Sequence, residues 1–119
     1  MFRTLVSVVG RAMAMYRAER LLGDPELKQY TEFLNVQFAI SLNGRGDVLV
    51  RLTPEGANPI EVEISAHVFY PVYTVYAVTP SGYQHVLWCS GSADGAAAAA
   101  AAAVDLATYR NLFATTAVG

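Results

Sequence analysis

The sequence has few of the groups that disulfide-bonded domains and metalloenzymes need. Of its 119 residues, one is cysteine and two are histidine. A single cysteine cannot form an internal disulfide or a cysteine-based metal cluster, so the chain needs no oxidising compartment to fold. The longest apolar run, Ala96–Val104, falls far short of the ~20 residues of a membrane-spanning helix. We therefore expect no membrane span, no metal and no cofactor.

Charge is also scarce. Charged residues make up 15% of the chain and hydrophobic residues 54%, whereas soluble domains typically carry about 25% charged residues. The net charge is −2, and no lysine or arginine lies between Arg51 and Arg110, which argues against a nucleic-acid partner. So little charge favours an intracellular subunit that buries surface against other protein subunits. A compact monomer with a dry core is the alternative.

The hydrophobic periodicity predicts one α+β domain over residues 1–119. We expect two N-terminal helices, at Phe2–Leu22 and from Pro25 to near Asn35, the second capped by Asp24. A five-stranded antiparallel meander should follow, then a flexible loop over residues 90–95 and a C-terminal helix from near Ala96 that packs on the sheet. The expected strands are Val36–Leu42, Val48–Thr53, Ile60 to about Phe69, Val72–Thr79 and Tyr83–Cys89.

The spacing of apolar residues also predicts which faces are buried. The strand from Ile60 has one apolar side and one polar side, with Glu61 and Glu63 on the latter. The last two strands place apolar residues on both sides, so we expect that part of the sheet to need cover on both faces from its own helices or from a partner. The predicted buried stripe of the first helix is Phe2, Leu5, Val6, Val9, Met13 and Tyr16. That of the last helix is Ala99, Ala102, Leu106, Tyr109 and Phe113.

The first helix is basic and amphipathic. It carries four arginines before and around its first acid, Glu19, and this resembles a mitochondrial presequence. The segment 1–22 then predicts a mitochondrial location if it acts as a targeting signal. Two other interpretations stand beside this one: an ordinary first helix that packs on the sheet, and a helix that makes peripheral contact with a membrane surface.

The reactive side chains form no convincing catalytic set. His67 and His85 would sit on different strands without matched ligands, whereas zinc needs three or four. Cys89 and His85 should share one side of a strand, but they lie four residues apart, roughly 13 Å, which is too far for activation of the thiol. We expect Cys89 to be a small buried apolar residue. The sequence therefore predicts no catalytic residues and a protein that is not an enzyme.

Aromatic residues supply the main candidate for recognition. Tyrosine and tryptophan are favoured in protein interfaces because they bury a large area at low entropic cost. We expect a structural or assembly subunit that binds partners through six aromatic residues and two arginines of the first helix. The alternative is a small-molecule-binding or enzyme-like cone whose internal pocket uses His67, His85, Tyr73 or Tyr76. The predicted partner-binding residues are Phe69, Tyr70, Tyr73, Tyr76, Tyr83, Trp88, Arg3 and Arg11.

Overall fold

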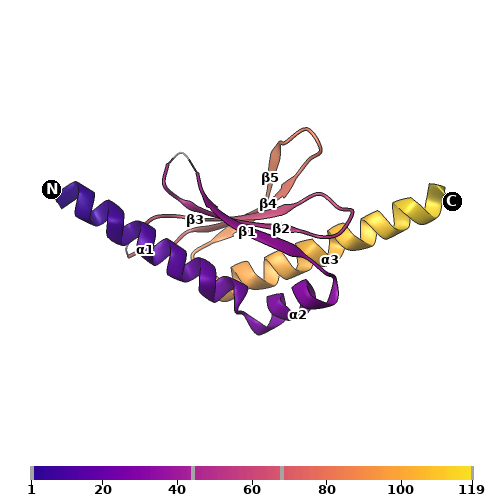
Figure 1. Cartoon of the computed structure of the whole chain (residues 1–119), viewed down its shortest axis with the longest axis horizontal. Helices are drawn as coiled ribbons and strands as arrows, with labels where there is room; N and C mark the ends of the chain where they lie inside the picture. Colours follow the sequence, from indigo (N-terminus) through magenta and orange to yellow (C-terminus); the bar gives the residue numbers. More distant parts are fainter. Residues whose placement is uncertain (1, 44, 68, 119) are drawn as a thin grey trace.

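The computed structural model describes the backbone of residues 2–43, 45–67 and 69–118, and the side chains of these residues except 2–7 and 109–118. Two helices precede five strands, and a long helix follows them (Figure 1). The elements are α1 (Phe2–Leu22), α2 (Pro25–Phe33), β1 (Gln37–Leu42), β2 (Val48–Thr53), β3 (Ile60–Ile64), β4 (Tyr73–Val78), β5 (Gln84–Ser90) and α3 (Ala93–Val118).

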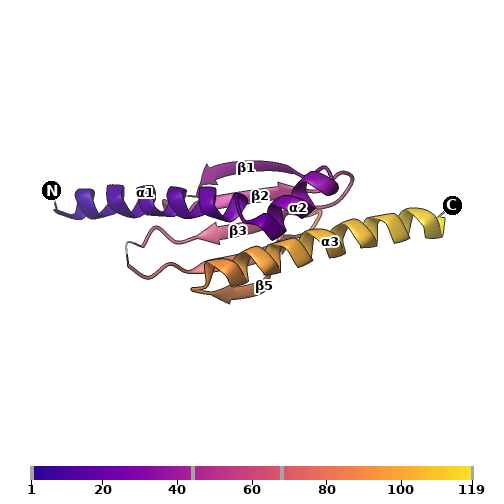
Figure 2. The same ribbon diagram turned by 90° about the horizontal axis from the view of Figure 1, so that it is seen from below.

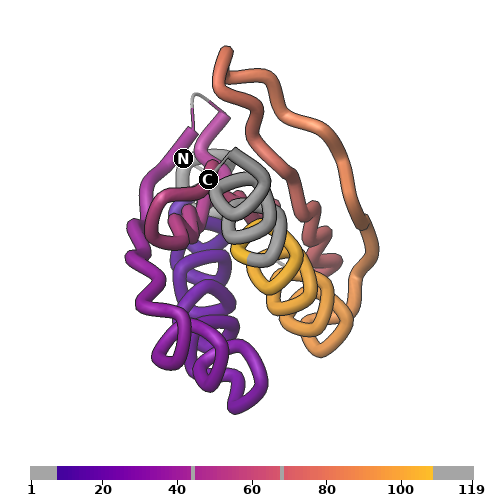
Figure 3. Tube along the Cα trace, turned by 90° about the vertical axis from the view of Figure 1, so that its right-hand side faces the viewer, coloured from indigo at the N-terminus to yellow at the C-terminus, as the bar shows by residue number. Residues whose placement is uncertain are grey.

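The strands form one antiparallel sheet in the order β1-β2-β3-β4-β5. All three helices cover the same face of this sheet (Figures 1 and 3). Val50 illustrates the core on that face, because it is fully buried and pairs with Ile40 on one side and Val62 on the other. The predicted α+β fold, with its C-terminal helix packed on the sheet, is confirmed.

Local sequence signals explain the start and the end of α2. The Asp24 carboxylate accepts hydrogen bonds from the backbone N–H groups of Glu26 and Leu27, at 3.0 and 3.3 Å. Pro25 fills the first helical turn, where its missing N–H costs nothing. At the other end, Asn35 adopts φ +52°, a left-handed conformation that asparagine tolerates, and turns the chain into β1.

Two predicted boundaries were wrong. β3 ends at Ile64 rather than near Phe69, because Ser65 pairs with Val72 through its backbone N–H and the chain beyond it leaves the ladder as a loop. The 90–95 loop is shorter than predicted, since α3 begins at Ala93. The Ser92 hydroxyl accepts the N–H of Gly95 at 3.0 Å and caps the helix there.

The predicted buried stripe of α1 was also wrong where the side chains are described. Val9 and Tyr16 are 39% and 54% exposed. The face against the sheet is instead made of small residues, and Gly10 lies so close that a Cβ added to it would be 2.3 Å from the carbonyl oxygen of Ala66. Small side chains allow this close approach, which the large residues of α1 would prevent. The buried residues are Gly10, Ala14, Ala18 and Leu21; Phe2, Leu5 and Val6 lie outside the described side chains.

The alanine-rich helix α3 packs through a different face than predicted. Ala102 and Leu106 are exposed, and Ala99 is only partly buried. The start of the helix sets its rotation, because Gly95 lies against the indole of Trp88, where an added Cβ would be 2.6 Å from Cζ2. The residues turned to the core are Ala96, Ala97, Ala100, Ala101, Ala103 and Val104; the side chains of Tyr109 and Phe113 lie outside the described ones.

The molecule is elongated, with extents of 60 × 31 × 21 Å. The first half of α1 projects past one end of the sheet, and the second half of α3 projects past the opposite end (Figure 2). The second sheet face carries none of the described helices and displays polar side chains on its central strands. On β2 and β3 this open face carries Arg51, Glu61 and Glu63, as expected for strands with one apolar and one polar side.

Candidate interaction surface

A charged network occupies the middle of the open sheet face. The side chain of Glu61 is 3% exposed, although it lies on the face without helices. The guanidinium of Arg51, on the neighbouring strand, donates to its carboxylate at 2.8 and 3.0 Å, and the Gln84 amide donates at 2.8 Å. The carboxylate is thus fully engaged by side chains from β2 and β5. This arrangement binds the sheet together and leaves Glu61 little capacity for substrate chemistry.

The histidines and the cysteine lie apart. His67 is in the loop after β3, whereas His85 pairs with Ala77 near the other end of the sheet. The bulge in the β4–β5 ladder puts His85 and Cys89 on opposite faces, so the expectation that they share one side is wrong. Cys89 is exposed rather than buried, and its sulfur lies 3.6 Å from the Thr74 hydroxyl. The described residues hold no group of three potential metal ligands.

The six predicted aromatic residues do not form one patch. Tyr73 is 3% exposed and belongs to the core, while Trp88 is half-buried under the start of α3. Tyr76 lies on the open face. Only Phe69, Tyr70 and Tyr83 are largely exposed, at 79%, 75% and 72%.

The two predicted arginines are far from the exposed aromatics in the chain. Arg11 is exposed, and its guanidinium lies against Gly46 in the β1–β2 hairpin. The side chain of Arg3 lies outside the described ones.

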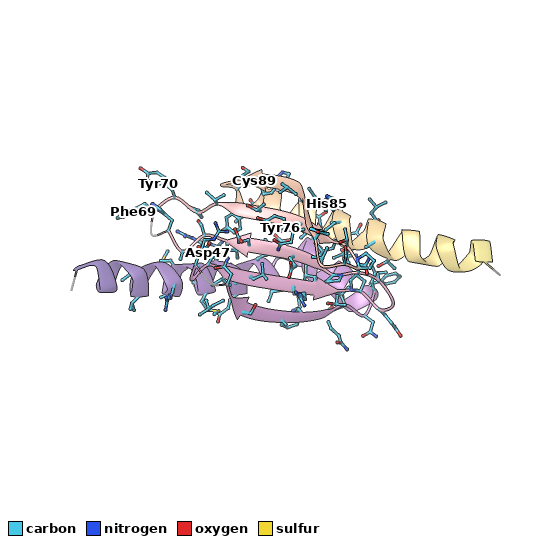
Figure 4. The ribbon with its side chains drawn as sticks, turned by 90° about the horizontal axis from the view of Figure 1, so that it is seen from above. Asp47, Phe69, Tyr70, Tyr76, His85 and Cys89 are labelled. Carbon is cyan, nitrogen blue, oxygen red and sulfur yellow. The ribbon has the colours of Figure 1, made fainter. Side chains whose placement is uncertain are left out.

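Between β3 and β4, the chain presents Phe69 and Tyr70 to solvent at one end of the sheet (Figure 4); we call its described residues, 65–67 and 69–72, the aromatic loop. The imidazole Nδ1 of His67 accepts the backbone N–H groups of both aromatics, at 3.2 and 3.0 Å. Its ring also lies 5.5 Å from that of Tyr70. His67 therefore fixes the backbone from which the two exposed rings project.

Neighbouring elements anchor the same loop at three further points. The Asp47 carboxylate accepts the N–H of Ala66 at 3.0 Å, and the guanidinium of Arg17 in α1 donates to the carbonyl of His67 at 2.6 Å. Ser65 closes the loop, because its hydroxyl accepts the N–H of Val72 at 2.9 Å. These contacts tie the two described sides of the loop, residues 65–67 and 69–72, to the fold, and contacts made before a partner arrives lower the entropic cost of binding.

Sequence reasoning selected Phe69 and Tyr70 but missed how they are held. It placed His67 on a strand and gave it no role in the loop. A sequence signal for this contact does exist: His67 carries a side-chain acceptor and precedes Phe69 and Tyr70, whose N–H groups it binds, by two and three residues. Asp24 shows the same spacing toward Glu26 and Leu27, and there the sequence did predict the cap.

The edge strand β5 carries a second set of exposed apolar side chains. Val86 and Leu87 are 62% and 51% exposed, and Tyr83 lies in the turn that precedes them. A β-bulge increases the local twist of its strand. The turn of the β4–β5 hairpin accordingly rises away from the helices (Figure 1), and α3 leaves these residues uncovered.

Burial affects the ionisation of Tyr73. It raises the pKa of the Tyr73 hydroxyl above 10.0, and the guanidinium groups of Arg17 and Arg20 oppose this shift in part. The unfolded chain therefore loses this proton at a lower pH than the folded chain, and stability falls as the pH rises above 10.

We expect Tyr73→Phe to reduce the alkaline loss of stability. The pKa of Tyr76 is raised as well, by burial and by the Glu63 carboxylate, so Tyr76→Phe is the comparison and part of the loss should remain in each single variant. Urea unfolding at pH 8 and above pH 10 measures the effect. An unchanged alkaline loss in the Tyr73→Phe, Tyr76→Phe double variant would contradict this assignment.

The polar side chains of the alternative pocket do not converge. His67 lies in the aromatic loop, Tyr73 points into the core, Tyr76 lies on the open face and His85 is on β5. Several surface hollows of the described residues are lined by other side chains. One of about 300 Å³ is formed by residues 56–60 with Ala77, Val78 and Ala107, and one of about 560 Å³ lies on the outer side of α2.

In the described part of the chain, no helix combines the length and the apolar content needed to cross a membrane. The chain matches no protein-family model, and no curated protein and no solved structure is significantly similar to it.

Proposed function

We propose that the chain is a non-catalytic assembly subunit that docks on another protein through the aromatic loop. The observation that carries the proposal is the exposure of Phe69 and Tyr70 on an anchored loop: both rings are largely exposed, although four side chains from three parts of the fold bond its described backbone. Large aromatics on rigid backbones are typical anchors of protein interfaces.

The chemistry of the surroundings supports a protein partner. No lysine or arginine lies between Arg51 and Arg110, and the guanidinium of Arg17, which reaches the loop from α1, donates to the carbonyl of His67. RNA-binding surfaces instead combine exposed aromatic rings with basic side chains that contact phosphate. The carboxylates of Asp47 and Glu61 are engaged in structural hydrogen bonds. In the described residues, every buried side-chain nitrogen or oxygen has a hydrogen-bond partner. The polar groups thus support the fold and the aromatic groups are left for contact.

Removing the two rings should abolish partner binding without unfolding the chain. We expect the free energy of unfolding of the Phe69→Ser, Tyr70→Ser double variant to change by no more than about 0.5 kcal/mol, as for ordinary surface substitutions. It should lose the proteins that the unaltered chain retains in an affinity capture from its native source, quantified by mass spectrometry. Size-exclusion chromatography with light scattering then checks the complex directly.

Phe33→Ser is the matched control, because Phe33 is 85% exposed on α2 and lies outside the aromatic loop. A general loss of exposed apolar surface would affect both variants equally. The proposal is wrong if the two variants retain the same proteins, or if the unaltered chain is a monomer that retains none.

Membrane contact and mitochondrial targeting, which the sequence also suggested for the first helix, are secondary proposals. Peripheral membrane contact would use the projecting half of α1, and a targeting role would make the complex mitochondrial. A targeting presequence is usually cleaved off. Residues 1–22 contribute Ala14, Ala18 and Leu21 to the core, and this argues against their removal. Liposome co-sedimentation of the unaltered chain and of a Val8→Ser, Tyr16→Ser variant, in which two exposed apolar side chains of α1 are replaced and the core is kept, tests the membrane contact.

A further inference from the structure

The outer edge of β1 is unprotected. Natural sheets usually guard such an edge with charged residues, proline or a bulge. The six residues of β1, Gln37–Leu42, include no charged residue and no proline, and they pair with β2 in an unbroken register. The other edge strand, β5, differs because its ladder contains a bulge. β1 is thus the edge that can accept another strand.

The backbone parity shows which groups of β1 face outward. The N–H of Asn43 bonds the carbonyl of Asp47 at 2.9 Å, which makes this pair a hydrogen-bonded one. Hydrogen-bonded pairs alternate along an antiparallel ladder. With the β1–β2 register, Gln37, Ala39 and Ser41 therefore bond to β2. The N–H and C=O groups of Phe38, Ile40 and Leu42 point away from the sheet, toward the free edge.

The side chains of these same residues are left partly uncovered. Phe38, Ile40 and Leu42 share the helix-covered face with the buried residues of β2, but Phe38 and Leu42 remain 60% and 52% exposed. The helix layer does not extend under the outer side of β1, and a hollow of about 400 Å³ lies between α2 and Phe38. One row of residues therefore presents both unpaired backbone groups and unburied apolar surface.

We propose that two copies of the chain associate through β1, antiparallel and about a two-fold axis at Ile40. In this register Phe38 faces Leu42 of the second copy and Ile40 faces Ile40. Each pair joins outward-facing backbone groups, so all six of those N–H groups find acceptors, and a shift by two residues in either direction loses two bonds. A shift by one residue would place the apolar row of one copy on the polar face of the other.

Because the β1 edge is complementary to itself in this register, the partner that fits it is a second copy of the chain. The two-fold axis stands perpendicular to the sheet, so both helix layers lie on the same side of a continuous ten-stranded sheet. The Phe38, Ile40 and Leu42 rows of the two copies then cover each other, and no charge is buried. The inference is independent of the proposed function, since the aromatic loop belongs to β3 and β4, two strands away from this edge.

Charge-swapped variants test the register. In the dimer, Phe38→Lys, Leu42→Lys places lysine opposite lysine twice, and Phe38→Glu, Leu42→Glu repels itself likewise. We expect each variant alone to dissociate at least about tenfold more readily than the unaltered chain, and an equimolar mixture to form a heterodimer. Analytical ultracentrifugation measures both. Val86→Lys, Leu87→Lys on β5 is the control and should leave the dimer unchanged.

Hydrogen exchange on the unaltered chain gives a second readout that needs no substitution. The amides of Phe38, Ile40 and Leu42 should become protected as concentration rises, while those of Ala39 and Ser41 are protected throughout. A chain that stays monomeric at roughly 1 mM, the weak end of specific association, would overturn the proposal. So would charge-swapped variants that dimerise normally, or loss of association in the β5 control.

Discussion

Replacing Gly10 by valine is expected to lower the free energy of unfolding by about 3 kcal/mol, at the upper end of what overpacking usually costs. A Cβ at this position would lie 2.3 Å from the carbonyl oxygen of Ala66 and 3.1 Å from its carbonyl carbon. The obstacle is backbone, and the Ala66 N–H is already bonded to Asp47, so the strand end cannot yield cheaply. α1 must therefore move off the sheet.

Urea unfolding followed by circular dichroism measures this loss, and Gly23→Ala is the matched control. The nearest atom to an added Cβ at Gly23 is the Glu19 carbonyl oxygen at 3.5 Å, an ordinary contact, so that variant should change stability by about 0.5 kcal/mol or less. If Gly10→Val unfolds at the same urea concentration as the unaltered chain, α1 is not seated on Ala66.

The second large effect is expected at the ion pair of the open sheet face. Arg51→Met leaves the carboxylate of Glu61 buried with only the Gln84 amide as its partner. Breaking a buried pair costs about 3–5 kcal/mol, and the half-exposed guanidinium of Arg51 reduces our expectation to about 2 kcal/mol. The double variant Arg51→Met, Glu61→Met should regain most of this loss, because no charge is then left unpaired.

A double-mutant cycle on chemical unfolding isolates the coupling between the two side chains, which we expect to exceed about 1 kcal/mol. The exposed pair Arg45–Glu63 supplies the control. Its Arg45 side chain is 77% exposed and lies 3.6 Å from the carboxylate, so Arg45→Met should cost less than about 0.5 kcal/mol. Additive effects at Arg51 and Glu61 would show that the Glu61 carboxylate is hydrated.

The elements of this fold could be predicted because their boundaries carry local chemistry. Asp24 and Pro25 mark the start of α2, and Gly46, at φ +83°, marks the β1–β2 turn. Val48, Val50 and Leu52 at every second position, and the strict alternation from Ile60 to Ile64, identified the inner strands. These signals act within a few residues, so one sequence suffices to read them.

The buried faces of the helices could not be predicted in the same way. The periodicity of α1 favoured Val9 and Tyr16, but close packing against the sheet selected Gly10 and Ala14. In α3 the alanine run carries no hydrophobic periodicity, so the sequence does not show which face of the helix is buried. The rotation of α3 depends instead on the close packing of Gly95 against Trp88 of β5. The same holds for the candidate site. The sequence identified the exposed aromatics Phe69 and Tyr70, but it did not predict the bulge that places His85 and Cys89 on opposite faces.

The alanine run of α3 gives this helix an uneven mutational tolerance. Ala101 is fully buried, whereas its neighbour Ala102 is exposed. A fully buried methyl group leaves no room for a larger side chain, so enlargement at Ala96, Ala100 or Ala101 pushes α3 away from the elements on which it packs. A run of one small residue suggests that each position tolerates substitution equally well. Here, residues that look interchangeable in the sequence differ in whether a larger side chain has room, and the buried ones determine how closely α3 packs on the rest of the fold.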